Sequence, residues 1–298
     1  EYDNLVMNPK IRKTKIKARD LENEISKLQQ ESGYPYIINI DTANRSNPID
    51  GKIIMSNLCS EILQVQEPSV INGKQEYEVL GTDISCNLGS TNIVNLMDSP
   101  DFGKSVRAMT RALTFVTDAS DIDVVPSIQN GNALNHTIGL GAMGLHTYFA
   151  KNQMEYGSPE SLEFTDLYFM LLNYWTLVES NNIAKERGEV FHNFEKSAYA
   201  DGSYFTDYIT GDYQPKSDKI KALFDGVFIP SGEDWAALAE AVKKDGLYHQ
   251  NRLAVAPNGS ISYINDTSAS IHPITRMIEE RQEKKIGKIY YPAPYLSN

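Results

Sequence analysis

Apolar positions follow helical spacing in several long stretches of the chain and run together in short ones. Residues 19–30 carry apolar side chains every three or four positions, namely Leu21, Ile25 and Leu28. This spacing predicts an amphipathic helix that ends before Gly33. The next apolar run, residues 36–40, predicts a short buried strand. The pattern therefore predicts a helix that leads into a strand.

Three further helices are predicted from the same spacing and from their boundary residues. Each begins at a residue type that accepts hydrogen bonds from the first helical turn: Asp101, Ser158 and Ser231. The helix after Ser158 is expected to run to Arg187 and end at Gly188, and the helix after Ser231 to end at Gly246. The alternation of such helices with short strands predicts an α/β fold.

A short segment, residues 53–63, carries three polar or reactive groups at alternate positions: Asn57, Cys59 and Glu61. Alternate side chains of an extended chain point the same way, so an amide, a thiol and a carboxylate are predicted to converge. Apolar flanks favour an extended loop that faces a cleft. On chemistry alone, Cys59 and Glu61 fit a nucleophile with its general base, a radical carrier with an acid/base group, or a core cysteine near an unrelated glutamate.

Cys86 is the second of only two cysteines in 298 residues. It lies in an alternating stretch, residues 83–93, that predicts a strand leading into the apolar run 93–96. A structural disulfide between the two cysteines is one interpretation. A chain of this length folds without a covalent crosslink, and its first residues form no apolar leader, so we expect a reduced pair in the cytoplasm.

Several motifs follow one another along the chain. They are SGYPY at 32–36, NRSNPIDG at 44–51, MSNLCSEI at 55–62, DISCNLGS at 83–90, APNGSISYIN at 256–265, SIHP at 270–273 and YYPAP at 290–294. Together they resemble the large, catalytic subunit of class I ribonucleotide reductases, and the later motifs are most similar to the class Ib branch. The resemblance spans nearly the whole chain. Asn258 departs from it, because threonine is expected at that position.

The resemblance implies thiyl-radical chemistry on a ribonucleoside diphosphate, whose 2′-hydroxyl leaves as water. Cys59 would carry the radical and take hydrogen from C3′, Glu61 would accept the proton of the 3′-hydroxyl, and Asn57 would hold the ribose hydroxyls. Cys86 would belong to the dithiol that supplies two electrons by becoming a disulfide, and its partner cysteine would lie upstream of this sequence. Substrate contacts are also implied for Leu58, Ser60 and Leu88.

A loop at residues 256–262 is implied to bind the substrate phosphates. The implied contacts are Pro257, Asn258, Gly259, Ser260 and Ile261. Gly259 lets the backbone approach an anion closely, and the segment after it is expected to begin a helix whose free N–H groups favour phosphate. Taken alone, such a turn is more typical of an ordinary strand-to-helix connection. The resemblance therefore carries this prediction.

Composition and charge indicate which classes of ligand and environment the chain does not suit. The formal net charge of −11 argues against nucleic acid as the main ligand, and no stretch approaches the ~18 uninterrupted apolar residues of a membrane helix. The five histidines are scattered and form no close zinc-ligand pattern. We expect no cofactor bound directly in this chain. The resemblance instead implies a separate, metal-containing small subunit that supplies the radical, and a reductant of the thioredoxin or glutaredoxin type.

The resemblance also implies the architecture, a ten-stranded α/β barrel of two five-stranded halves with a finger loop, residues 53–63, at its centre. We expect residues 1–298 to form a single catalytic portion of that barrel. Missing N- and C-terminal parts would complete a subunit that forms a homodimer, and the isolated chain would be inactive. Two other classes stay open: a thiol hydrolase that uses Cys59, and a non-catalytic piece that completes a barrel only with a second chain.

Overall fold

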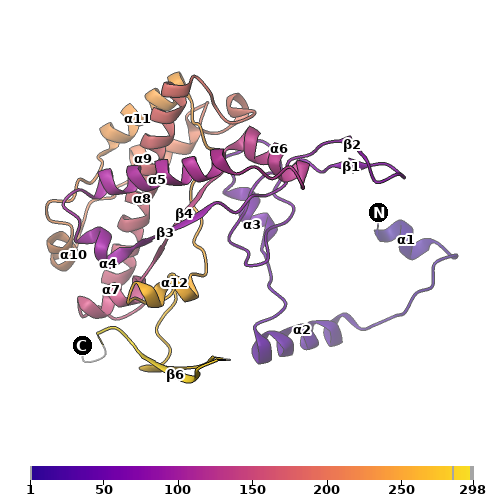
Figure 1. Ribbon diagram of the computed structural model, residues 1–298, viewed down its shortest axis with the longest axis horizontal. Helices are drawn as coiled ribbons and strands as arrows, with labels where there is room; N and C mark the ends of the chain where they lie inside the picture. Colours follow the sequence, from indigo (N-terminus) through magenta and orange to yellow (C-terminus); the bar gives the residue numbers. More distant parts are fainter. Residues whose placement is uncertain (1, 284, 296–298) are drawn as a thin grey trace. The chain divides into compact units, whose positions relative to one another are not determined.

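The computed structural model describes residues 2–283 and 285–295. Contacts within the chain divide it into two compact units, Glu1–Asn39 and Ile40–Asn298. Figure 1 labels most of the helices and strands along the chain. The candidate site residues named above all belong to the second unit.

The first unit contains the helices α1 (Tyr2–Met7) and α2 (Ala18–Ser32). The prediction of a helix at residues 19–30 is confirmed by α2, which ends at Gly33 with a left-handed φ of 79°. The predicted strand at residues 36–40 is wrong. Its apolar side chains Tyr36 and Ile37 are more than half exposed, and no described strand pairs with the segment. An apolar run forms a strand only where a neighbouring strand satisfies its backbone groups.

The second unit contains three parallel chain segments that lie side by side. Strand β3 (Leu88–Asn92) pairs in parallel with β4 (Gly139–Met143), and Leu140 of β4 bridges in parallel to Leu253. Close packing of β4 against the third segment requires Gly141, because a Cβ atom there would lie 2.2 Å from the carbonyl oxygen of Ala254. Figure 1 shows the two-stranded sheet of β3 and β4, beside which the third segment lies.

The strand predicted before Ile93 is shorter than expected. Residues 83–87 have no strand geometry, and α4 (Ile93–Met97) begins directly after β3. The side-chain Oδ1 of Asn92 accepts a hydrogen bond from Val94 N at 3.1 Å. Asn92 therefore caps the first turn of α4, so the apolar run at residues 93–96 forms a helix and does not continue the strand.

Three long helices confirm the predicted boundaries. They are α5 (Phe102–Ala119), α8 (Pro159–Arg187) and α11 (Gly232–Asp245). The Oδ1 of Asp101 accepts from Lys104 N at 2.8 Å, and the Oγ of Ser158 accepts from Ser161 N at 3.2 Å. Ser231 forms a reciprocal capping box with the third residue of its helix. Each cap satisfies N–H groups that the helix itself leaves free.

One face of β3 packs against the helical layer formed by α5, α8 and α11, and the opposite face does not. A Cβ atom at Gly89 would contact Leu113 of α5, and Thr91 Oγ1 lies 2.7 Å from the hydroxyl of Tyr168 in α8. The alternate residues Leu88 and Ser90 are only partly buried on the opposite face. That second face is available to the candidate site.

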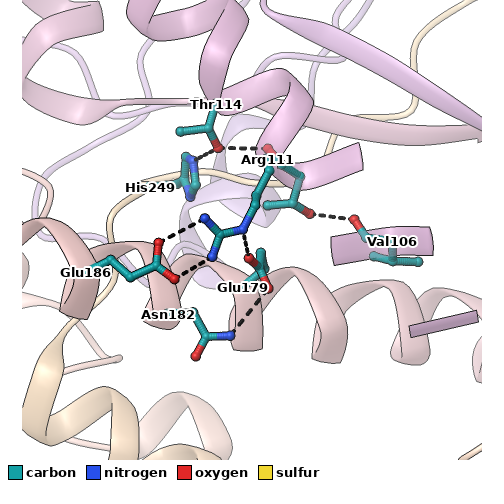
Figure 2. A network of polar contacts seen from close by, with 8 residues as sticks. Val106, Arg111, Thr114, Glu179, Asn182, Glu186 and His249 are labelled. Carbon is teal, nitrogen blue, oxygen red and sulfur yellow. Dashed lines mark hydrogen bonds and ion pairs between the residues drawn. The ribbon is translucent and has the colours of Figure 1, made fainter. Parts of the chain in front are cut away.

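Polar contacts also join α5 to α8, as Figure 2 shows. The guanidinium of Arg111 pairs with Glu179 and, at 2.6 Å, with Glu186. Beside this pair, the buried ring of His249 lies 2.9 Å from the hydroxyl of Thr114 on one side and 2.9 Å from that of Ser180 on the other. The network ties the two helices together where apolar packing alone would leave buried polar atoms without partners.

Shorter elements connect these parts. They are α3 (Ile40–Arg45), β1 (Val70–Ile71), β2 (Tyr77–Val79), α6 (Pro126–Asn135), α7 (Leu145–Lys151), α9 (Thr206–Thr210), α10 (Asp218–Leu223), α12 (Gly259–Ile264), β5 (Ile278–Glu283), β6 (Gly287–Pro292) and the 3₁₀ turns Phe194–Lys196 and Ser203–Phe205. Strands in the described part of the chain form three two-stranded sheets, so the ten-stranded barrel stays a prediction. Within residues 2–283 and 285–295, no helix has the length and apolar character needed to cross a membrane.

Candidate active site

The finger loop is a tight turn, and the prediction of an extended segment is wrong. Ser60 N donates to the carbonyl oxygen of Asn57 at 3.1 Å, and Ser60 itself has a left-handed φ of 64°. Alternation therefore does not determine where Asn57, Cys59 and Glu61 point. Leu58 stands at the tip of the turn with 92% of its surface exposed. In the apolar flanks Ile53 and Ile62 are buried, whereas Ile54 and Met55 are more than half exposed.

Amide side chains hold the base of this turn. Asn57 Oδ1 accepts from Ile62 N at 3.1 Å across the turn. Asn44 Oδ1 accepts from Ile53 N at 2.9 Å, and Asn44 Nδ2 donates to the carbonyl oxygen of the same residue at 2.9 Å. Because the carbonyl oxygen of the Asn57 side chain is used inside the loop, the group that Asn57 can offer a ligand is its amide N–H₂.

Cys86 lies within electrostatic range of two finger-loop residues. Burial raises the pKa of the Cys86 thiol, and unfavourable charge interactions with Glu61 and then Cys59 raise it further. Both cysteines are free thiols and exposed. Glu61 Oε2 is buried and has no hydrogen-bond partner among the residues that the structure describes. A buried carboxylate oxygen without a donor is suited to accept a proton or a ligand hydroxyl.

The predicted phosphate loop, residues 256–262, contacts β3 at Ser90, four residues after Cys86. The third parallel segment leads through Pro257 into α12, which begins at Gly259 as expected. Ser260 and half of Ile261 are exposed at the start of this helix. Leu88 lies between Cys86 and Ser90 in the chain, so the half-buried face of β3 separates the Cys86 thiol from the loop.

The side chain of Asn258 is turned into the protein. Its Nδ2 donates to Ser90 Oγ at 2.8 Å and to the Ala142 carbonyl oxygen at 3.5 Å, and its Oδ1 accepts from Ser270 N at 2.6 Å. Asn258 makes no side-chain cap of α12. The predicted direct contact of Asn258 with substrate therefore has to come from its backbone.

Three residues with positions at this site were missed from the sequence. Ser90 Oγ accepts a hydrogen bond from the Asn258 amide, and Asn251 Nδ2 donates to the carbonyl oxygen of Leu63 at 3.4 Å, at the end of the finger loop. Asn44 lies in the motif at residues 44–51, which is a signal, although no role was assigned to it. Ser90 ends the motif at residues 83–90, which is also a signal, whereas Asn251 lies in no such motif.

Comparison with known proteins decides the family. The sequence profile described as "Ribonucleotide reductase, barrel domain" matches residues 1–298. The chain belongs to this family. Its barrel-type α/β fold follows from that membership.

The curated relatives of this barrel domain are named as reductases. The ribonucleoside-diphosphate reductase subunit alpha of Bacillus subtilis (strain 168) is 44% identical over 299 residues, covering 100% of this chain and 43% of that protein. The subunit alpha of Mycoplasma pneumoniae is 43% identical, covering 99% of this chain and 42% of that protein. A ribonucleoside-diphosphate reductase NrdEB subunit alpha of Bacillus subtilis is 40% identical over 98% of this chain and 26% of its own length, and it supports the class Ib resemblance. This barrel chain therefore spans less than half the length of these relatives.

The described part of this reductase barrel chain contains no group of three or more His, Cys, Asp or Glu residues that could hold a metal ion. The chemistry available at the site is that of two thiols, one carboxylate and several amides. Burial and the nearby Glu61 and Cys59 favour the thiol form of Cys86, because a raised pKa disfavours the thiolate at neutral pH.

Proposed function

We propose that this chain is the catalytic barrel portion of a class Ib ribonucleoside-diphosphate reductase alpha subunit. Its reaction is the reduction of ribonucleoside diphosphates to deoxyribonucleoside diphosphates. The observation that carries the proposal is that Glu61 and Cys59 of the finger loop lie near enough to Cys86 to add to the rise that burial causes in the pKa of its thiol, in a chain that matches the reductase barrel family over its whole length. The printed names of the relatives support the substrate class.

In this proposal Cys59 and Glu61 act on the 3′ side of the ribose. The thiyl radical of Cys59 takes a hydrogen atom from C3′, so an S–H bond forms as a C–H bond breaks. Glu61 accepts the proton of the 3′-hydroxyl as a general base, a role that fits its buried, unpartnered Oε2. The Asn57 amide N–H₂ donates to a ribose hydroxyl and holds it for reaction.

Cys86 provides reducing equivalents in the second half of the reaction. The 2′-hydroxyl leaves as water with a proton from a thiol, and two electrons come from a dithiol that becomes a disulfide. A thiol with a raised pKa stays protonated at neutral pH, which suits a proton donor. The second cysteine of that dithiol belongs, by the family resemblance, to another part of the subunit. Thioredoxin- or glutaredoxin-type proteins then re-reduce the pair.

The phosphate loop holds the other end of the substrate. Backbone groups of residues 257–261, with the exposed Ser260 hydroxyl, bind the diphosphate, and Leu88 and Leu58 contact the nucleoside between loop and thiols. Gly259 permits close approach of the backbone to the anion. The proposal also assigns the ten-stranded closed barrel to the complete subunit, which works as a homodimer in the cytoplasm with a metal-containing small subunit as radical source.

Reconstitution tests this function. The full-length subunit that contains this chain is combined with its small subunit and a thioredoxin-type reductant, and deoxyribonucleoside diphosphate is quantified by chromatography. We expect multiple turnovers with the complete system and none with residues 1–298 alone. Substrate binding without any product in the complete system would contradict the proposed reaction, and turnover by residues 1–298 with the small subunit would contradict the need for the other segments.

A further inference from the structure

The hydrogen-bonding groups of the Asn258 side chain are already used by the protein. A primary amide has two N–H donors. One points to Ser90 Oγ at 2.8 Å and the other to the Ala142 carbonyl oxygen at 3.5 Å. The amide oxygen accepts from Ser270 N at 2.6 Å, and the residue is buried. No donor of this side chain remains for a phosphate oxygen unless one of these bonds breaks.

These partners belong to three different parts of the site. Ser90 lies on the half-buried face of β3, four residues after Cys86. Ala142 lies in β4, and Ser270 follows α12 in the chain. The 2.8 Å bond to Ser90 is the shorter of the two donated bonds, and it joins the phosphate loop to the strand that continues from Cys86.

We propose that Asn258 is a positioning residue whose side chain fixes the phosphate loop to β3 through Ser90, and so sets where the diphosphate lies relative to Cys86 without itself contacting the phosphates. The inference rests on the proposed function, because it takes a ribonucleoside diphosphate as the ligand of the loop. A shift of about 1 Å in a bound substrate is enough to cost a large factor in rate, so such a tether has a measurable effect.

A double-mutant cycle separates this role from direct phosphate contact. The variants are Asn258→Ala, Ser90→Ala and the double change in the full-length subunit. Each is titrated with a ribonucleoside diphosphate and with the matching nucleoside by calorimetry. We expect Ser90→Ala to weaken diphosphate binding on the order of tenfold, the cost of one buried hydrogen bond. Asn258→Ala should weaken it at least as much, because it also removes the contacts with Ala142 and Ser270. The double change should be no more than about twofold worse than Asn258→Ala, because both single changes break the Asn258–Ser90 contact.

Asn265→Ala, at the C-cap of the same helix, is the matched control. The Asn265 side chain donates to the carbonyl oxygen of Ile261 in α12 and not to β3, so diphosphate affinity should stay at the parental value. Nucleoside affinity should change less than about threefold in every variant, since the tether acts at the phosphate end. In turnover assays KM should rise with the diphosphate dissociation constant while kcat falls less.

Two results would overturn the inference. If Asn258→Ala loses diphosphate affinity and Ser90→Ala does not, the Asn258 side chain contacts the phosphate directly. If the two losses multiply in the double variant, the residues act independently. Should Asn258→Ala fail to fold, Ser90→Ala compared with Ser90→Thr, which keeps a hydroxyl acceptor, still decides whether the tether matters. A parent that binds the diphosphate but does not reduce it contradicts the proposed function and leaves the tether measurable.

Discussion

The helical layer and the site edge of the second unit are stabilised in different ways. In the helical layer, formed by α5, α8 and α11, large side chains such as Tyr168, Leu171 and Trp235 have almost no exposed surface. At the site edge, formed by the finger loop, residues 83–90 and the phosphate loop, Leu58 is 92% exposed. The layer is held by buried apolar area, whereas amide hydrogen bonds hold the edge.

This difference separates residues that maintain the fold from residues that are available to a ligand. A side chain packed on every side has no surface left for chemistry, and replacing it leaves a cavity. The exposed tip of the finger loop can be changed at little cost in stability, so the residues there are free to serve the reaction. Predictions that separate stability from activity therefore test the comparison directly.

The largest effect is expected at Cys59. Cys59→Ser in the full-length subunit should abolish ribonucleotide reduction, because a serine O–H bond is too strong to act as the hydrogen-atom carrier although the side chain is of similar size. Nucleotide affinity and thermal unfolding should stay near the parental values, since Cys59 is exposed. Product formation is measured by chromatography. Activity of the variant within tenfold of the parent would refute the radical role.

Cys86→Ser should remove multiple turnovers while it leaves initiation intact. The dithiol that supplies two electrons is lost, but Cys59 can still take hydrogen from C3′, so free base should be released in place of deoxynucleotide. Tritium release from a C3′-labelled substrate and the yield of free base are the two readouts. A normal deoxynucleotide yield with a thioredoxin-type reductant would show that Cys86 is not the reductant.

A stability contrast follows between the two regions. Leu171→Ala in α8 should lower the free energy of unfolding by about 2–5 kcal/mol, because it opens a cavity in a fully buried position. Leu58→Ala at the loop tip should change it by less than about 0.5 kcal/mol. Urea denaturation of both variants measures the difference. Similar losses for both would mean that the finger loop is packed in solution.

The helical layer could be predicted largely from the sequence, and the site edge could not. The caps at Asp101, Ser158 and Ser231 depend on neighbours within a few residues, so local pattern was sufficient. Local pattern failed at residues 36–40, where strand formation depends on a distant partner. It failed again at the finger loop, where the turn at Ser60 replaced the expected extended chain.

The candidate site residues were proposed from motif resemblance, whereas the hydrogen bonds that hold the surrounding loops could not be predicted from it. Cys59 and Cys86 lie in long shared motifs, so their chemistry was suggested before the fold was known. The contacts from Asn258 to Ser90 and from Asn251 to Leu63 each join residues more than 160 positions apart. No spacing in the sequence encodes such a contact, because it arises only when the parallel segments pack together.

A pH effect of intermediate size is expected in the helical layer. Burial holds the pKa of His249 well below its usual range, and three nearby groups act in the same direction: Arg252, His136 and Arg187. The folded protein therefore keeps His249 neutral, whereas the unfolded chain takes up a proton below a pH of about 6.5. Stability should be full above that pH and fall as pH decreases, by up to about 1.4 kcal/mol per pH unit from this one group.

The matched variants for this pH effect are His249→Gln and His192→Gln. Glutamine at position 249 still offers a donor and an acceptor but cannot be protonated, so the loss of stability between pH 6.5 and 5.5 should become smaller. His192 is exposed, and its replacement should leave the slope unchanged. Urea midpoints across that range give the answer. An unchanged slope in His249→Gln would show that other groups account for the acid sensitivity.

The smallest predicted effect tests whether Glu61 lies beside Cys86. Because burial and then the charge of Glu61 raise the pKa of Cys86, its reaction with iodoacetamide should reach half of the maximal rate at a higher pH than that of free cysteine. Glu61→Gln removes the carboxylate charge at nearly constant size, so the midpoint should move to lower pH while burial keeps it above the free value.

Glu67→Gln is the control, since Glu67 is exposed and is not among the groups that act on this thiol. Mass spectrometry of the peptide that contains Cys86 reads the modification without interference from other cysteines. A midpoint that is the same in Glu61→Gln and the parent would separate the finger loop from Cys86, and the thiols and carboxylate would then not form one site.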